Sequence, residues 1–425
     1  MKRIFALFLL LSLLLPLASC SSGIEAPAET IPVETEEAQT EEKSLTPEEE
    51  KILAERRDKV ADYMHQMATI LWRSAEDLDY TIKSDVSPNQ VTNGSGLPQK
   101  LTLKKGRLYQ GLPYTYASNG IASFSQAFTE TDGIPDLSGL NWQMLSGGGK
   151  TARFGNDCAT AVMQAWGQVG NSFAITSTAY LCANNGFLPV GSYYVSKAQL
   201  SDTKKDCKNN GEETMFASYA KLQKADAVVE RNGGSGHTMM VTSVHAVPYG
   251  DSFHPEQSYI TVTHQTRSYY AKDAKYYDEK LGEDVYTWYG IDDKYTFRQL
   301  YNSGYLPITC KELIDPSPLP ELKISSSVTE LTPENFFTGE IRSNQMIEFL
   351  AAEIKNDSDA VVQKAIVAAT RKTKTEFPCN TFLDETYALG KIDLSALPQG
   401  SYTLTVTANL VNGERVPVRE LSFTK

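Results

Sequence analysis

Histidine is scarce in this sequence, and its scarcity narrows the chemistry open to the chain. Only five of the 425 residues are His, and none belongs to an HExxH motif. The six cysteines form no closely spaced pair of the kind that binds zinc. A metal site built from His237, His245 and His264 therefore has no motif spacing in its support. We expect neither a metal nor a cofactor.

The sequence also lacks an excess of positive charge. Its formal net charge is −12. Much of this charge comes from residues 24–50, which hold ten Glu against one Lys and contain no aromatic residue. Such a composition is typical of a solvated chain, and it predicts a disordered acidic tether over residues 21–46. The rest of the chain is only mildly acidic, so we expect no binding of nucleic acid.

The apolar stretch Ile4–Leu17 is too short to span a membrane comfortably. It follows Lys2-Arg3, as the apolar part of an export signal follows its charged start. The next residues, Leu17–Cys20, resemble the lipobox of bacterial lipoproteins. We therefore expect residues 1–20 to be a lipoprotein signal, with Cys20 lipidated and the protein anchored to the outer face of the cytoplasmic membrane or elsewhere in the cell envelope. An ordinary secretory signal cut nearby is the alternative.

The pattern of helix and strand signals divides the remaining chain into four parts. A capping Thr46, a proline at the first helical position and acidic residues in the first turn predict a helix over residues 47–78. Residues 79–315 mix helix and strand signals with many Gly and Asn turns, which indicates an α+β domain. Residues 316–320 are rich in proline and predict a stiff linker.

The last part, residues 321–425, reads almost entirely as strand. Asn412-Gly413 is a strong hairpin signal between two runs of strand-forming residues. Short strands over this length favour an immunoglobulin-like β-sandwich. The part contains no histidine, so we interpret it as a spacer or an adhesive module that contacts the cell wall or a protein partner.

The chemistry is expected to centre on Cys158. The segment Phe154–Val162 passes from a glycine-containing loop into a helical pattern, and Asp157 is a good N-cap. Cys158 would then lie in the first turn, where unpaired amides and the helix dipole favour a thiolate. Beside an imidazolium, such a thiol has its pKa lowered from about 8.5 to roughly 3.5–7.5.

Two histidines are placed to assist this thiol. His237 follows the glycine-rich segment Asn232–Gly236 and begins a strand-like run. The next strand-like run, Tyr259–His264, places His264 on the same face as its apolar residues by the period of two. If the two strands pair, His264 can bond the far nitrogen of His237 and leave the near nitrogen for Cys158.

The order Asp-Cys at a helix start, Gly-His opening a strand and His on the next strand is similar to the NlpC family of papain-like cell-wall cysteine peptidases. Leu222–Val228 resembles the family's Leu-x-x-Gly-Asp-hydrophobic-Val segment, and Gly111–Tyr114 resembles its Gly-x-Pro-Tyr segment. Two residues depart from the pattern: Ala159 replaces the usual Ser and Ala225 the usual Gly. No SH3-like wall-binding repeat accompanies these motifs.

The resemblance implies a role for each matching residue. Cys158 would be the nucleophile, His237 the general base and His264 the residue that orients the base. Tyr114 and Asp157 would contribute to substrate binding. The backbone N–H of Cys158 would supply one donor to the oxyanion.

The resemblance also implies a substrate, a peptide bond in peptidoglycan stems such as that between D-Glu and the diamino acid. Two alternatives stay open. One is a scaffold that kept the fold and binds wall or surface partners without hydrolysis. The other is an amidase or acyltransferase acting on a non-wall substrate.

Four cysteines have no role in this scheme, namely Cys182, Cys207, Cys310 and Cys379. They allow three disulfide pairings if they are oxidised. Cys182 and Cys207 are closest in sequence and are our choice for a disulfide, with buried free thiols as the alternative.

Overall fold

The fold is described from a computed structural model of the chain. The residues described are 44–74, 77–81, 100–126, 155–170, 177–182, 185–195, 197, 199–328, 330–368, 376–383 and 388–425. The expected signal at residues 1–20, its Cys20 and the tether up to residue 43 lie outside them. Within the described residues, none of the helices combines the length and apolarity that a membrane crossing requires.

The N-terminal helix α1 spans Pro47–Thr69. It starts as predicted, with a capping box between Thr46 and Glu49. The predicted end at residue 78 is wrong. The chain leaves the helix at Ile70 and forms strand β1, Leu71–Arg73, because the indole of Trp72 donates to the carbonyl of Gly111 at 2.8 Å and β1 pairs with a neighbouring strand.

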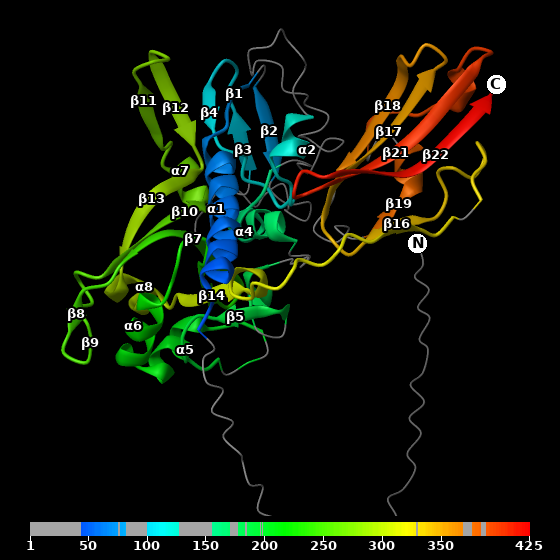
Figure 1. The fold of residues 1–425 in the computed structure, drawn as a ribbon. Coiled ribbons are helices and arrows are strands. Elements are labelled where there is room, and N and C mark those ends of the chain that lie inside the picture. The colour runs from blue at the N-terminus through cyan, green and yellow to red at the C-terminus, as the bar shows by residue number, and fades with distance from the viewer. Residues whose placement is uncertain are drawn as a thin grey trace, which may run out of the picture. The chain divides into compact units, whose positions relative to one another are not determined.

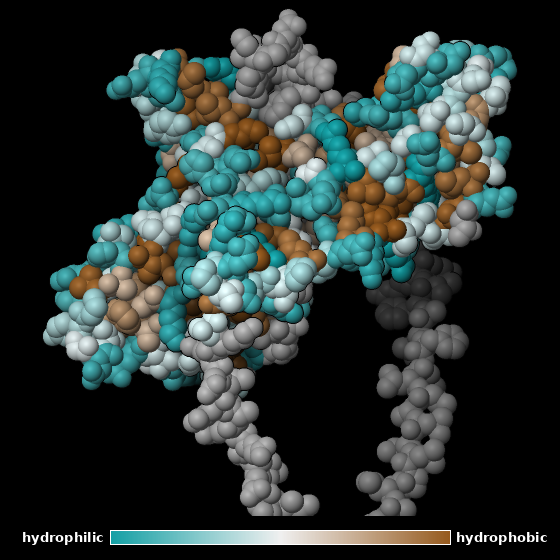
Figure 2. Space-filling view, in the orientation of Figure 1, coloured by the Kyte–Doolittle hydropathy of each residue, from teal (hydrophilic) through white to brown (hydrophobic). Residues whose placement is uncertain are grey.

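Helix α1 belongs to the core of the N-terminal half. Its buried face includes Val60, Met64 and Met67, which join the main hydrophobic cluster. The helix packs on α4 and on strands β7, β10 and β13 (Figure 1). Its opposite side is hydrophilic in the surface view (Figure 2). The helix is therefore a packed element rather than a separate stalk.

A six-stranded sheet forms the centre of this half. Its order is β13-β10-β7-β6-β14-β5, and every neighbouring pair is antiparallel. The strands are β5 Phe187–Pro189, β6 Ala227–Asn232, β7 Ser235–His245, β10 Tyr259–Gln265, β13 Tyr289–Thr296 and β14 Leu306–Cys310. Helix α4, Cys158–Trp166, packs on β7 and β10. Helices on an antiparallel sheet make the α+β class predicted from the sequence.

A smaller sheet has the order β1-β4-β12-β11. The rings of Trp72 on β1, Tyr109 on β4 and Trp288, which directly follows β12, stack on one another. The other strands of this sheet are β4 Leu108–Gln110, β11 Lys275–Asp278 and β12 Glu283–Thr287, and two further pairs are β2 Leu78–Thr81 with β3 Lys100–Leu103 and β8 Pro248–Tyr249 with β9 Ser252–Phe253. The remaining helices are α2 Ile121–Ser125, α5 Thr203–Asn210, α6 Glu212–Ala220, α7 Arg267–Ala271 and α8 Phe297–Ser303. The 3₁₀ turns are η1 Gly167–Val169, η2 Thr178–Tyr180, η4 Lys311–Leu313, η5 Cys379–Leu383 and η6 Leu394–Ala396.

The C-terminal part consists of two sheets that share one hydrophobic core. The first sheet holds β15 Ile324–Ser326, β16 Glu340–Ser343 and β19 Glu376–Pro378; the second holds β17 Ile347–Asn356, β18 Val361–Ala368, β20 Leu389–Gly390, β21 Ser401–Leu410 and β22 Arg415–Thr424. Asn412-Gly413 lies in the hairpin between β21 and β22, as expected. The connection is residues 411–414 rather than two residues, and it closes with a bond from the Leu410 amide to the Glu414 carbonyl.

The linker at residues 316–320 is tied to α1 at its start. The guanidinium of Arg56 donates to the carbonyls of Glu312, Asp315 and Ser317 at 3.0, 2.7 and 2.7 Å.

Beyond the linker, the buried carboxylate of Glu348 on β17 accepts hydrogen bonds from the amides of Gly120 and Ser123 and from the Ser123 hydroxyl. These bonds join the C-terminal part to the first turn of α2. Strand β17 therefore makes buried hydrogen bonds to the N-terminal half of the chain.

The predicted disulfide between Cys182 and Cys207 is wrong. Both residues are buried thiols, as are Cys310 and Cys379, and no disulfide occurs among the described residues. The Cys207 sulfur lies 3.6 Å from the carbonyl oxygen of Tyr305. Burial away from water raises the pKa of the Cys207 thiol to about 12. Burial thus leaves this sulfur protonated and inert.

Candidate functional site

Cys158 is the first residue of α4, as predicted. The carboxylate of Asp157 accepts a hydrogen bond from the Thr160 amide at 3.0 Å, and the Thr160 hydroxyl accepts one from the Asp157 amide at 2.8 Å. This reciprocal cap fixes the start of the helix, so the Cys158 side chain stands at the positive end of the dipole. The carboxylate of Asp157 is engaged in the cap, and its expected role in substrate binding stays a prediction.

The loop before Cys158 is clamped to the segment that carries Tyr114. The Asn156 amide donates to the Pro113 carbonyl at 3.2 Å, and the Thr115 amide donates to the Asn156 carbonyl at 2.9 Å. Gly155 adopts a φ of 107° at this contact, and a Cβ there would lie 2.3 Å from the Pro113 oxygen. Only glycine allows this approach.

The clamp brings Tyr114 close to Cys158. Burial raises the pKa of the Tyr114 phenol well above its usual value, and the neighbouring Cys158 raises it further. The guanidinium of Arg267 lies 5.5 Å from the centre of the Tyr114 ring. The Gly-Leu-Pro-Tyr segment and the Asp-Cys helix start, far apart in the sequence, therefore meet in one site.

His237 lies two residues into β7. Strands β6 and β7 form a hairpin in which Asn232 pairs with Ser235 and His237 pairs with Glu230. The glycine-rich segment of the sequence supplies the turn at Gly233-Gly234. His237 is half-buried, on the strand that packs against α4.

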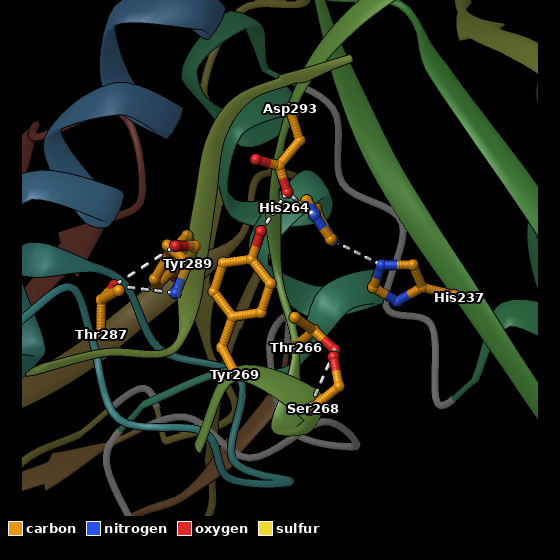
Figure 3. A network of polar contacts seen from close by, with 8 residues as sticks. All are labelled: His237, His264, Thr266, Ser268, Tyr269, Thr287, Tyr289 and Asp293. Carbon is orange, nitrogen blue, oxygen red and sulfur yellow. Dashed lines mark hydrogen bonds and ion pairs between the residues drawn. The ribbon is translucent and has the colours of Figure 1, made fainter. Parts of the chain in front are cut away.

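His237, His264 and Asp293 form a hydrogen-bonded relay across three neighbouring strands (Figure 3). The Nε2 atom of His237 lies 2.7 Å from Nδ1 of His264. The Nε2 atom of His264 lies 3.0 Å from Oδ2 of Asp293. The hydroxyl of Tyr269 donates to the same carboxylate oxygen. The predicted bond between the two histidines is present, and the relay extends beyond it to a carboxylate.

The carboxylate at the end of the relay fixes the tautomers of both rings. An ionised Asp293 only accepts hydrogen bonds, so Nε2 of His264 carries a proton and Nδ1 of the neutral ring does not. Nδ1 of His264 then accepts from Nε2–H of His237. The lone pair of His237 is thereby assigned to Nδ1, the ring nitrogen that takes no part in the relay.

The relay is closely fitted at Gly290 on β13. A Cβ at this position would lie 2.2 Å from Oδ2 of Asp293 and 2.6 Å from Nε2 of His264. Strand β10 shifts its register against β13 between Val262 and His264, so the imidazole faces Asp293 across this irregularity. Gly290 leaves the space in which the ring and the carboxylate meet.

The surroundings favour a neutral His237 and a charged Asp293. Burial lowers the pKa of His237 well below its usual value, and the nearby His264 lowers it further. The hydrogen bond from His264 lowers the pKa of Asp293, and the bond from Tyr269 adds to the effect. The neutral form of His237 is thus favoured, whereas the sequence argument expected an imidazolium beside a thiolate.

Sequence reasoning missed Asp293 and Tyr269. Both lie outside any motif: Asp293 is inside β13 and Tyr269 is inside α7. Their role depends on how β13 and α7 pack. Among the described residues, no group of three or more His, Cys, Asp or Glu side chains is arranged to hold a metal ion.

Comparisons with known proteins give no family for this chain. No family model matches it, and no curated protein matches it. A structural match is the crystal structure of a tetra-tandem repeat in the extending region of a large adhesion protein, at 13% identity and a TM-score of 0.17. The match covers 47% of this chain and 40% of that one. A TM-score this low carries no argument about fold or function.

The relay predicts that Asp293→Asn lowers kcat/KM for the expected amide hydrolysis by about 10- to 100-fold. This is less than the roughly 10⁴-fold cost of the same change directly beside a catalytic histidine, because Asp293 contacts His237 only through His264. An amide can donate to Nε2 of His264 and so reverse the tautomers. Loss of the negative charge also disfavours the protonated rings, so the acid limb of the pH–rate profile should move to lower pH. Initial rates measured between pH 4 and 8 check both effects.

Asp292→Asn is the matched control for this variant. Asp292 is the preceding residue, but its exposed carboxylate accepts from the Thr242 hydroxyl at 2.7 Å and takes no part in the relay. The control should keep the wild-type rate and profile. An equal loss in both variants would show that charge on β13, rather than the relay, sets the rate.

Proposed function

We propose that this protein is an exported cysteine hydrolase that cleaves amide bonds, with Cys158 as nucleophile and His237 as base. The observation that carries the proposal is the 2.7 Å contact between His237 and His264, on strands that pack against the helix opened by Cys158. A scaffold needs no such alignment of two imidazoles and a carboxylate.

The relay supports a two-step reaction. Nδ1 of His237 takes the Cys158 proton as the sulfur attacks the amide carbon, and amides of the first turn of α4 stabilise the oxyanion. His237 then gives the proton to the leaving amine, and a thioester remains. Water loses a proton to His237 and attacks the thioester, which releases the acid and the thiol. His264 and Asp293 hold the charge that His237 carries between these transfers.

The proposed fold and substrate class follow the NlpC resemblance: a papain-like peptidase domain, an immunoglobulin-like sandwich and a peptidoglycan stem peptide as substrate. The backbone at Ala225 is compatible with the glycine that the motif usually has at this position. Ala225, which replaces the usual glycine, has a φ of 72°, a conformation that glycine adopts without strain. Lipidation at Cys20, anchoring in the envelope and a wall or protein partner for the sandwich are parts of the same proposal.

Product analysis on purified peptidoglycan fragments tests the function. The full chain should release a new free amine and a new acid, located by mass spectrometry, and Cys158→Ala should release neither. A matched control is Cys310→Ala, which removes a buried thiol on β14.

Three results would change the proposal. Cleavage by Cys158→Ala would remove Cys158 from the reaction. Absence of cleavage with Cys158 still readily alkylated would point to a non-wall amide. Absence of cleavage with an unreactive Cys158 would favour the scaffold function.

A further inference from the structure

The row of polar residues that forms the relay continues across the six-stranded sheet from β7 onto β6 and β14. Directly opposed residues of antiparallel strands point to the same face, so Glu230 on β6 shares the face of its partner His237. On the other side of β6, Leu306 pairs with Val229, which sets the preceding Tyr305 opposite Glu230. His237 thus has His264 on one side and Glu230 on the other.

Glu230 and Cys158 both lie near Tyr305. Burial raises the pKa of the Tyr305 phenol, and both Glu230 and Cys158 raise it further through their charges. One phenol therefore senses both side chains. Glu230 is half-buried rather than enclosed, so part of the residue is accessible from solvent.

This carboxyl has no partner of its own among the described residues, which show neither an ion pair nor a hydrogen bond to its side chain. The guanidinium of the adjacent Arg231 instead donates to the Thr178 hydroxyl at 3.1 Å. Loss of water raises the pKa of Glu230 to about 7, and the charge of Arg231 offsets only part of this effect. A desolvated carboxylate is costly to hold unless a cation or donor accompanies it.

We propose that Glu230 binds an ammonium group of the substrate beside the bond that Cys158 attacks. The inference rests on the proposed function and names its specificity: an amide substrate that carries a positively charged amine. A stem peptide offers two such groups, the α-ammonium of its first residue and the side-chain ammonium of its diamino acid.

A synthetic stem tetrapeptide, L-alanyl-γ-D-glutamyl-L-lysyl-D-alanine, tests this with both amines free, with the α-amine acetylated and with the lysine amine acetylated. For the full chain, Glu230→Gln should lower kcat/KM on the free peptide roughly tenfold or more, mainly through KM, since it removes a charged hydrogen bond. Acetylation of the recognised amine should lower kcat/KM of the wild type by a similar factor. It should change kcat/KM of Glu230→Gln little. The sensitive amine identifies the group bound.

Glu213→Gln, an exposed change on α6, should behave as the wild type. Hydrolysis that neither Glu230→Gln nor either acetylation affects would overturn the inference and leave the proposed function standing. If no peptide is hydrolysed, calorimetry on Cys158→Ala decides separately. Binding that needs one free amine and Glu230 would support the inference although the proposed function fails, whereas binding that needs neither, or no binding, would overturn it.

Discussion

Replacement of His237 by Ala is expected to lower kcat/KM for amide hydrolysis by at least about 10⁴-fold, the usual cost of losing the base of a nucleophile–base pair. Without the imidazole, nothing takes the Cys158 proton at Nδ1 and nothing returns it to the leaving amine. His264 and Asp293 then no longer have an imidazole at position 237 to orient. Initial rates on the cleaved stem peptide give the measurement, and slower alkylation of Cys158 by iodoacetamide should accompany the loss.

His245→Gln is the matched control, because His245 lies on the same strand but pairs with Tyr259 at its far end. This variant should keep the wild-type rate. A His237→Ala variant that hydrolyses the peptide within tenfold of the wild type would mean that another group accepts the thiol proton.

The pH dependence of folding provides a second test of the His237 assignment. Its pKa is lowered in the folded state relative to about 6.5 in the unfolded chain. As the pH falls below about 6.5, the unfolded chain therefore gains a proton that the folded chain does not, and stability is lost. Above that pH the contribution is constant. His237→Ala should lose less stability than the wild type between pH 7 and 5, as measured by urea unfolding.

Replacement of Arg57 by Leu is expected to lower the free energy of unfolding by about 3–5 kcal/mol, the cost of leaving a buried charge without its partner. Arg57 on α1 donates to Oδ1 of Asp226 at 2.8 Å and to the carbonyls of Lys224 and Leu313. Asp226 is almost fully buried. Burial already raises the pKa of its carboxyl despite the guanidinium. Removal of Arg57 takes away this countercharge, and the hydrogen bond that the Gln223 amide donates to Oδ2 of Asp226 at 2.8 Å compensates only in part.

Urea unfolding at neutral pH measures this loss, with Lys59→Met as the control. Lys59 is exposed on the same helix, so its replacement should change stability by less than about 0.5 kcal/mol. The double variant Arg57→Leu/Asp226→Asn should recover part of the loss, because the orphaned charge is gone. A loss below about 1 kcal/mol in Arg57→Leu would mean that water reaches Asp226 and that α1 is less tightly packed than its contacts indicate.

Features set by short-range chemistry followed from the sequence alone. The starts of α1 and α4 were predictable because a capping box depends on residues three positions apart. The pairing of His237 with His264 was predictable because the period of two fixes the face on which each strand residue points. The α+β class followed from the same alternation of local signals.

The ends of elements were harder to predict than their starts. Apolar spacing continues past Thr69, but α1 stops there because Trp72 is held by Gly111, a residue that lies 39 positions further along the chain. Cys182 and Cys207 are the closest in sequence of the four remaining cysteines, yet both are buried as separate free thiols.

Only the tertiary structure placed Asp293, Tyr269 and Glu230 at the site. Asp293 meets His264 because β13 pairs with β10 through a shifted register, and Glu230 meets His237 because of the register of the β6–β7 hairpin. No local sequence pattern predicts which residues face each other across these strands, because strand register depends on which faces the whole sheet must bury. The sequence by itself predicted a candidate nucleophile, a candidate base and the contact of that base with His264, and the structure contains this contact. The packed sheet decided which carboxylate completes the relay and which is left for a ligand.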